Sequence, residues 1–139
     1  PAISHVIPAL ILKFHQAMEN SPNSDVEIWG TGSASREFLY VEDCARAIRI
    51  SMEEHEDPDP VNIGTNSEIN IREFAHTISD VMGYDGNIYF NSSDPDGQPR
   101  RCLDTSKAKS MFGFEAQVSL DEGLERTIEW FRNDYINNF

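Results

Sequence analysis

The chain has 139 residues, which suffice for one domain with a hydrophobic core but are too few for two domains of ordinary size. Lysine and arginine contribute 11 cations against 24 aspartates and glutamates, so the formal net charge is -13. This charge repels phosphate, which argues against nonspecific nucleic-acid binding and against attachment to an acidic membrane. An anionic ligand therefore needs cations gathered at one place.

Neither the cysteines nor the apolar segments suggest a metal site or a membrane span. Cys44 and Cys102 are far apart, and the sequence has no Cys-x-x-Cys pair and no histidine spacing typical of zinc. Apolar runs extend over only a few residues, too short for a transmembrane helix. We therefore predict a cytoplasmic protein with reduced thiols and no bound metal.

The first predicted element is a helix from Ser4 to about Glu19, because apolar residues recur there at helical spacing. His5 lies at its start, and histidine is the side chain best suited to proton transfer at neutral pH. A purely structural role for His5 is the alternative. Lys13 follows about 12 Å along the helix axis, so one long ligand can reach both side chains.

A strand, a glycine turn, a second strand and a helix are predicted in the segment that follows. The alternating run at 26–29 is typical of a strand, and the second apolar run begins at Phe38. Glu42 and Asp43 then open a helical pattern that continues to about residue 52.

The two glycines of this turn, Gly30 and Gly32, lie between an aromatic ring and a forked cation. Trp29 precedes the glycines and Arg36 follows them, a combination that suits a planar, anionic ligand such as a nucleotide. The alternative is a tight turn in which Trp29 fills the core and Arg36 is solvated.

Further helices and short strands alternate along the rest of the chain, so the predicted fold class is α/β or α+β. The predicted strands are 61–64, 68–71 and 87–90. Three further helices are predicted. The first is capped by Asn70 and ended by Gly83, the second is capped by Asp104 or Thr105 and ended by Gly113, and the third is capped by Ser119. The polar stretch 91–101, with its Pro-Asp-Gly turn and two adjacent arginines, is predicted to be a loop.

The sequence lacks the motifs of a self-sufficient oxidoreductase. The Gly30 turn leads into a strand and has no third glycine, so it is not a dinucleotide-binding fingerprint. No Tyr-x-x-x-Lys pair, serine nucleophile elbow or His-Glu-x-x-His zinc motif is present.

Several longer motifs nevertheless resemble one enzyme family. They are Ser-His-Val-Ile-Pro-Ala-Leu-Ile at 4–11, Trp-Gly-Thr-Gly at 29–32, Arg-Glu-Phe-Leu-Tyr-Val-Glu-Asp at 36–43, Asn-Ile-Gly-Thr at 62–65 and Pro-Asp-Gly-Gln-Pro-Arg-Arg at 95–101. This set is similar to the GDP-L-fucose synthases, a family of the extended short-chain dehydrogenase/reductases. The 36–43 motif is shared across nucleotide-sugar epimerases and dehydratases, whereas the 4–9 and 95–100 motifs are narrower.

The resemblance implies an NADP(H)-dependent, homodimeric enzyme that converts GDP-4-keto-6-deoxy-D-mannose to GDP-L-fucose by epimerisation at two carbons and reduction. It implies that residues 1–139 form the C-terminal substrate-binding domain, with the last elements of the nucleotide-binding sheet. The glycine-rich loop and the catalytic Ser, Tyr and Lys would belong to an absent N-terminal Rossmann part, which would hold most of the cofactor. By this resemblance the fragment alone is inactive.

The resemblance also assigns roles to individual residues. His5 matches the family histidine that contacts the cofactor and donates a proton during epimerisation. The substrate-contacting positions are matched by Lys13, Trp29, Arg36, Asp96 and Arg101. Trp29 would pack on the ligand, Arg36 would bind the diphosphate, and Asp96 would accept hydrogen bonds from hydroxyl or base N–H groups. Lys13 and Arg101 differ from the arginine and lysine that are frequent there, which changes the geometry of phosphate contact.

Two other hypotheses are open. The chain could be part of another NAD(P)-dependent nucleotide-sugar epimerase or dehydratase, since the 36–43 motif permits this. It could also be a noncatalytic interaction domain, whose exposed apolar faces would promote self-association.

Overall fold

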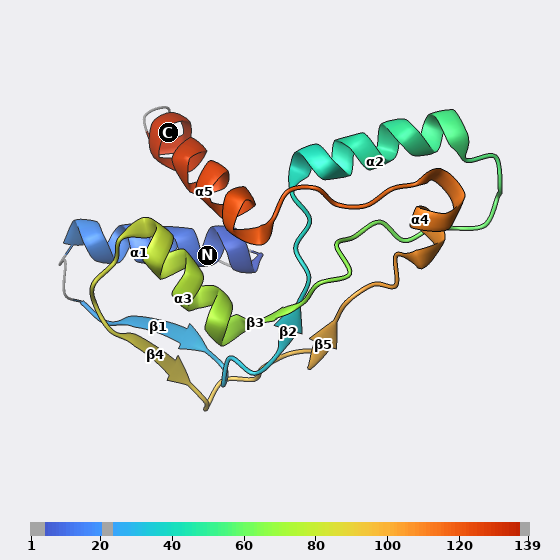
Figure 1. Cartoon of the computed structure of the whole chain (residues 1–139). Helices are drawn as coiled ribbons and strands as arrows, with labels where there is room; N and C mark the ends of the chain where they lie inside the picture. Colours follow the sequence, from blue (N-terminus) through green and yellow to red (C-terminus); the bar gives the residue numbers. More distant parts are fainter. Residues whose placement is uncertain (1–4, 21–23, 137–139) are drawn as a thin grey trace.

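The computed structural model of the chain describes residues 5–20 and 24–136, and the predicted helix start at Ser4 and part of the loop before β1 lie outside them. Helices alternate with short strands, which confirms the mixed α/β class (Figure 1). The elements are α1 (Val6–Asn20), β1 (Val26–Trp29), β2 (Ser35–Arg36), α2 (Val41–Glu54), β3 (Ile69–Asn70), α3 (Ile71–Met82), β4 (Ile88–Asn91), β5 (Arg100–Arg101), α4 (Ser106–Phe112), α5 (Leu120–Trp130) and the π-helical turn η1 (Phe131–Tyr135).

The strands form two small sheets. β1 and β4 pair in parallel, with Val26 opposite Ile88 and Trp29 opposite Asn91. In the second sheet β2 is central, antiparallel to β3 and parallel to β5. Residues of β1 alternate between buried and exposed, so one face of its sheet packs on the helices and the other is open. The glycine turn after β1 connects the two sheets.

The core consists of two clusters of apolar side chains. The larger unites α1, β1, α3 and α5, and its fully buried members include Phe14, Phe74 and Ile78. The smaller lies between α2 and α4, around Ala47, Ala108 and Phe114. Figure 1 shows α2 and α4 on one side of β2, and α1, α3 and α5 on the other. The β2 region therefore links two groups of helices.

The helix boundaries follow the predicted caps. Asn70 Oδ1 accepts a hydrogen bond from the Glu73 N–H at 2.8 Å, and Ser119 Oγ accepts one from the Glu122 N–H at 3.2 Å. Gly83 ends α3 with a positive φ of 71°. These predicted helix ends are confirmed. They were predictable from the sequence because each depends on local chemistry. Before α4, the Asp104 carboxylate accepts from the Ser106 N–H, whereas the Thr105 side chain makes no cap bond.

Three predictions about strands were wrong. The second strand is Ser35–Arg36 and does not begin at Phe38, whose ring instead stacks on Phe74 with centroids 4.2 Å apart. Residues 61–64 form no strand, although Val61 and Ile63 pack on the smaller cluster. In contrast, residues 100–101 lie in the predicted loop and form β5. Apolar runs in the sequence thus indicated which residues are buried. Whether a segment forms a strand depended instead on which other backbone segment the fold places beside it.

Asp43 joins α2 to the segment before α5. The residue is 2% exposed, and its carboxylate accepts hydrogen bonds from Arg46 at 2.6 Å and from the N–H groups of Gln117 and Val118 at 2.8 Å each. Burial by itself raises the pKa of Asp43, but the Val118 N–H, Arg46 and the Gln117 N–H outweigh it and hold the pKa below its ordinary value. A buried carboxylate with these donors remains ionised at neutral pH.

We predict that Asp43→Asn lowers the free energy of unfolding by about 2 kcal/mol at pH 7, because charge-assisted hydrogen bonds to a buried carboxylate are lost. The folded-state pKa is depressed, so this stabilisation is present above the unfolded pKa and is lost as pH falls through the folded value. Urea unfolding at pH 7 measures the loss of stability in Asp43→Asn, and urea unfolding at a pH below about 4 measures how far the difference from the wild type disappears. Glu53→Gln, at an exposed ion pair with Arg49, is the control, and an equal loss in both variants would contradict the prediction.

Candidate ligand-binding site

The glycine turn after β1 is bound to the loop before β5. The Thr31 N–H donates to Asp96 Oδ1 at 2.6 Å, and Thr31 Oγ1 donates to Asp96 Oδ2 at 2.8 Å. Gly30 has a φ of +85°, and a Cβ atom at this residue would lie 2.5 Å from Asp96 Oδ1. Only glycine lets the carboxylate approach this closely. We call residues 29–32 the ligand turn.

Asp96 is held ionised by this turn. The Thr31 hydroxyl and N–H, with a smaller contribution from the Gly32 N–H, keep the pKa of Asp96 below its ordinary value. Each oxygen that accepts from Thr31 retains a further lone pair. The carboxylate therefore orients the turn and still has capacity for another donor, so its predicted role as a substrate contact stays a prediction.

Trp29 and Lys13 lie together beside β1. The indole is 68% exposed, so the alternative that Trp29 fills the core is wrong. Lys13 Nζ lies 5.4 Å from the centroid of the Trp29 ring and donates to the Glu27 carbonyl oxygen at 2.7 Å. This cation–π contact helps to fix the indole while leaving it open to solvent.

Arg36 and Arg101 are neighbours across the second sheet. They are register partners in the parallel pair of β2 and β5. Arg36 Nη1 donates to the Ser35 carbonyl oxygen at 2.6 Å, and Nη2 lies 3.9 Å from the position that a Cβ of Gly97 would occupy. The Arg36 guanidinium thus lies beside the Asp96–Gly97 turn, which places it near the ligand turn as well.

The lysine and arginine side chains that form no ion pair with a carboxylate gather in this region. Within residues 5–20 and 24–136, six cations form ion pairs, namely Arg46, Arg49, Arg100, Lys107, Lys109 and Arg126. Leaving Arg132 aside, four other cations of that part form none, and they are Lys13, Arg36, Arg72 and Arg101. Lys13 of α1 lies over the Trp29 ring and Arg72 of α3 donates to the Thr31 carbonyl oxygen, whereas Arg36 and Arg101 are partners on β2 and β5. In a chain of net charge -13, such a gathering of cations favours an anionic ligand at this place.

His5 occupies a different part of the molecule from Lys13. It precedes α1, and its carbonyl oxygen accepts the Ala9 N–H at 3.1 Å. Ile7, two residues further, lines a mostly apolar cavity of about 510 Å³ between α1, the β2–α2 connection and α5. Lys13 lies further along α1, beside β1. The structure thus brings five of the predicted residues around the ligand turn, whereas His5 lies just before α1, two residues from the cavity-lining Ile7.

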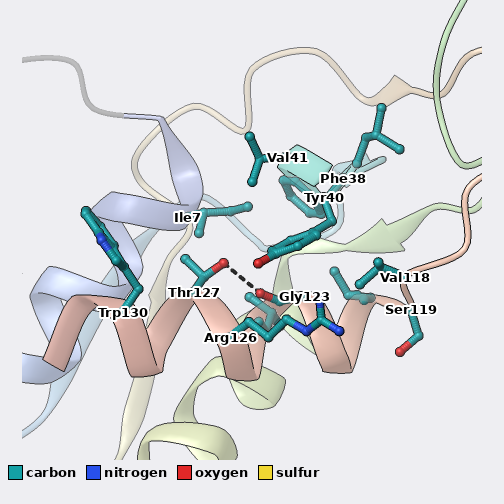
Figure 2. A pocket seen from close by; sticks show the side chains of 13 residues that line it. Ile7, Phe38, Tyr40, Val41, Val118, Ser119, Gly123, Arg126, Thr127 and Trp130 are labelled. Atoms are coloured by element: carbon teal, nitrogen blue, oxygen red, sulfur yellow. Dashed lines mark hydrogen bonds between the residues drawn. The ribbon is translucent and has the colours of Figure 1, made fainter. Parts of the chain in front are cut away.

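Figure 2 shows the cavity with the Tyr40 ring at its centre and Trp130 at one end. Tyr40 packs closely on α5, since a Cβ at Gly123 would lie 3.1 Å from its ring. The Thr127 hydroxyl donates to the Gly123 carbonyl oxygen at 2.6 Å. Sequence reasoning missed this cavity, because its lining comes from three separate segments that each read as ordinary helix or strand.

The described part of the chain offers no metal site and no membrane span. None of its helices has the length and apolar character needed to cross a bilayer. Nor do its histidine, cysteine, aspartate and glutamate side chains form a group of three or more that could hold a metal ion.

Comparison with known proteins adds independent findings. The model of the NAD dependent epimerase/dehydratase family matches residues 1–64. A GDP-L-fucose synthase from Escherichia coli (strain K12) is 43% identical over 141 residues, an alignment that covers 94% of this chain and 43% of that protein.

Solved structures show the same arrangement. A GDP-L-fucose synthetase from Naegleria fowleri bound to NADP has a TM-score of 0.88 at 28% identity, covering 96% of this chain and 41% of that one. A UDP-glucose 4-epimerase from Thermotoga maritima has a TM-score of 0.82 at 29% identity, covering 96% and 41%. The chain spans about two fifths of the length of the curated relatives. The chain is thus a homologue of part of the GDP-L-fucose synthases over nearly its whole length, and its first 64 residues match the NAD dependent epimerase/dehydratase family.

Proposed function

We propose that this chain is the substrate-binding portion of an NADP-dependent enzyme that converts GDP-4-keto-6-deoxy-D-mannose to GDP-L-fucose. One observation carries the proposal. Within a strongly acidic chain, cations that form no ion pair with a carboxylate gather around the exposed Trp29 indole and the ligand turn that Asp96 holds. The similarity to GDP-L-fucose synthases supports the same assignment.

The site suits a nucleoside diphosphate. Arg36 and Arg101, as register partners, can offer two forked guanidiniums to a diphosphate. The Trp29 indole offers a flat apolar face to a base or sugar. Asp96, ionised and held by Thr31, can accept from a base N–H or a sugar hydroxyl. Each of these contacts is part of the proposal.

The cofactor is held mainly by other parts of the protein. NADP(H) supplies the hydride for reduction, and such cofactors require free backbone N–H groups for their phosphates. The glycine turn of this chain does not provide them, because its Thr31 N–H is already bonded to Asp96. We therefore infer that residues 1–139 alone are inactive. His5, immediately before α1, would contact the cofactor and supply a proton during epimerisation.

The exposed face of α2 supports the existence of a covering segment. Val41, Ile48 and Met52 are 69%, 56% and 83% exposed, and their spacing places them along one stripe of the helix. The opposite side of α2 packs on α4. Because the chain spans about two fifths of its relatives, we propose that the remaining part of such a protein covers this stripe. The homodimer and the cytoplasmic location remain predictions.

A second candidate is another nucleotide-sugar epimerase or dehydratase, favoured by the TM-score of 0.82 with a UDP-glucose 4-epimerase. A third is a noncatalytic interaction domain, favoured by the exposed stripe of α2. The first prediction below distinguishes both candidates from the leading proposal, because only the leading proposal expects selective binding of a GDP-sugar.

We predict that the chain binds GDP-fucose at least about tenfold more tightly than UDP-glucose in isothermal titration calorimetry. Arg36→Lys should weaken GDP-fucose binding by about tenfold, because a point charge replaces a forked donor. Arg49→Lys, at an exposed ion pair on α2, is the matched control and should leave the affinity unchanged. An equal or absent response to the two nucleotide sugars would contradict the substrate assignment.

The α2 stripe should cause self-association while its cover is absent. Light scattering across concentrations is expected to show a rising mass for the wild-type chain and a constant mass for the double variant Ile48→Gln, Met52→Gln. Leu103→Gln removes an exposed apolar residue that is not part of α2 and serves as the control. A monomeric wild type that binds no hydrophobic dye would refute the exposed interface.

The role of His5 can be tested in a chimera in which this chain replaces the matching part of the Escherichia coli relative. His5→Asn should slow epimerisation by about 100-fold, since a positioned general acid is lost. Deuterium uptake from D2O at the two epimerised carbons, followed by NMR, measures the step directly. His76→Gln, an exposed histidine of α3, is the control, and unimpaired exchange in His5→Asn would remove the proposed role.

A further inference from the structure

Arg72, in the first turn of α3, is a cation for which sequence and resemblance suggested no role. Its Nη2 donates to the Thr31 carbonyl oxygen at 2.5 Å. Its guanidinium carbon lies 3.9 Å from the centroid of the Phe90 ring, a close cation–π contact. One face of the guanidinium is thus fixed by an aromatic ring, while one edge binds the ligand turn.

The backbone of Arg72 is fixed to the same turn. Its N–H donates to the Gly32 carbonyl oxygen at 2.9 Å. Gly32 has a φ of +77°, and a Cβ there would lie 2.7 Å from Phe90 Cε1 and 3.0 Å from Arg72 Cβ. Arg72 and Phe90 therefore close over Gly32, leaving no room for a side chain and little freedom for the turn.

Thr31 is bound from two sides. Its carbonyl oxygen accepts from Arg72, whereas its N–H and hydroxyl donate to Asp96. Arg72 comes from α3 and Asp96 from the loop between β4 and β5, so one residue of the turn is fixed between two distant segments. Because Trp29 is the first residue of this turn, its position depends on the same hydrogen bonds.

We propose that Arg72 is a positioning residue, which acts through Thr31 to hold Asp96 and Trp29 in the orientation that binds the nucleotide sugar. The inference rests on the proposed function. Arg72 forms no ion pair within the described residues, so the contacts that fix its guanidinium there are the Thr31 carbonyl oxygen and the Phe90 ring.

An arginine is required by this geometry. The planar guanidinium lies against the Phe90 ring and reaches the Thr31 carbonyl oxygen with the same group. A lysine keeps the charge but has neither the plane nor the fork. A role in general stability alone would predict that Arg72→Lys is tolerated once the protein folds, whereas positioning predicts a specific defect at Asp96.

The experiment compares Arg72→Lys and Arg72→Met with the wild-type chain, with Arg49→Lys and Arg49→Met on α2 as matched controls. Two quantities are measured at a temperature at which urea unfolding shows every variant to be folded. One is the GDP-fucose dissociation constant from calorimetry. The other is the pKa of Asp96, from the carboxyl carbon signal in an NMR titration.

Both Arg72 variants should raise the dissociation constant at least about tenfold. They should also raise the pKa of Asp96 toward its ordinary value, because Thr31 no longer holds its donors on the carboxylate. A rise in the pKa of Asp96 in Arg72→Lys separates positioning from loss of charge, because lysine keeps the positive charge. An unchanged pKa of Asp96 in both variants would overturn the inference.

Asp96→Asn supplies a second test that does not depend on the NMR signal. If Arg72 acts through the Thr31–Asp96 contact, the losses of GDP-fucose affinity in Arg72→Met and Asp96→Asn should not add in the double variant. Additive losses would contradict the inference. If the wild type binds no GDP-fucose while the Arg72 variants still raise the pKa of Asp96, the positioning role is supported and the proposed function fails.

Discussion

The hydrogen bonds between Thr31 and Asp96 are the contact on which the proposed binding site depends. They join residues separated by 65 positions and bring together the end of β1 and the loop that leads into β5. Because β2 follows this turn and pairs with β5, Arg36 and Arg101 become neighbours. The exposed Trp29, with Lys13 over its ring, lies at the start of the same turn. One short glycine segment thus collects side chains from four elements.

The rest of the fold supports this turn from two directions. The larger core buries α1 and α3 against β1, which fixes Lys13 and Arg72 relative to the strand. The smaller core holds α2 and α4, and Asp43 fastens α2 to the segment before α5. The stripe of α2 beginning at Val41 is left exposed. This exposed stripe is the face that we propose to be covered by the remaining part of a longer enzyme, since the chain spans about two fifths of its relatives.

Local chemistry made much of this architecture predictable. The Asn70 and Ser119 caps and the helical spacing of apolar residues gave the helices, and alternation gave β1 and β4. Strand pairing was less predictable, because β2 and β5 contain only two polar residues each and pair through tertiary approach alone. Five of the six predicted site residues gather around one turn, whereas Arg72 was missed: an arginine in a first helical turn reads as solvated until Phe90 and Thr31 are placed beside it.

The most direct test of the binding site is chemical-shift mapping of the ¹⁵N-labelled chain during titration with GDP-fucose. The account predicts that the largest amide shifts centre on Thr31, Gly97 and Arg101, the backbone around the proposed diphosphate position. UDP-glucose at the same concentration should cause much smaller shifts. Shifts confined to the apolar cavity around Tyr40, or none at the ligand turn, would contradict the account.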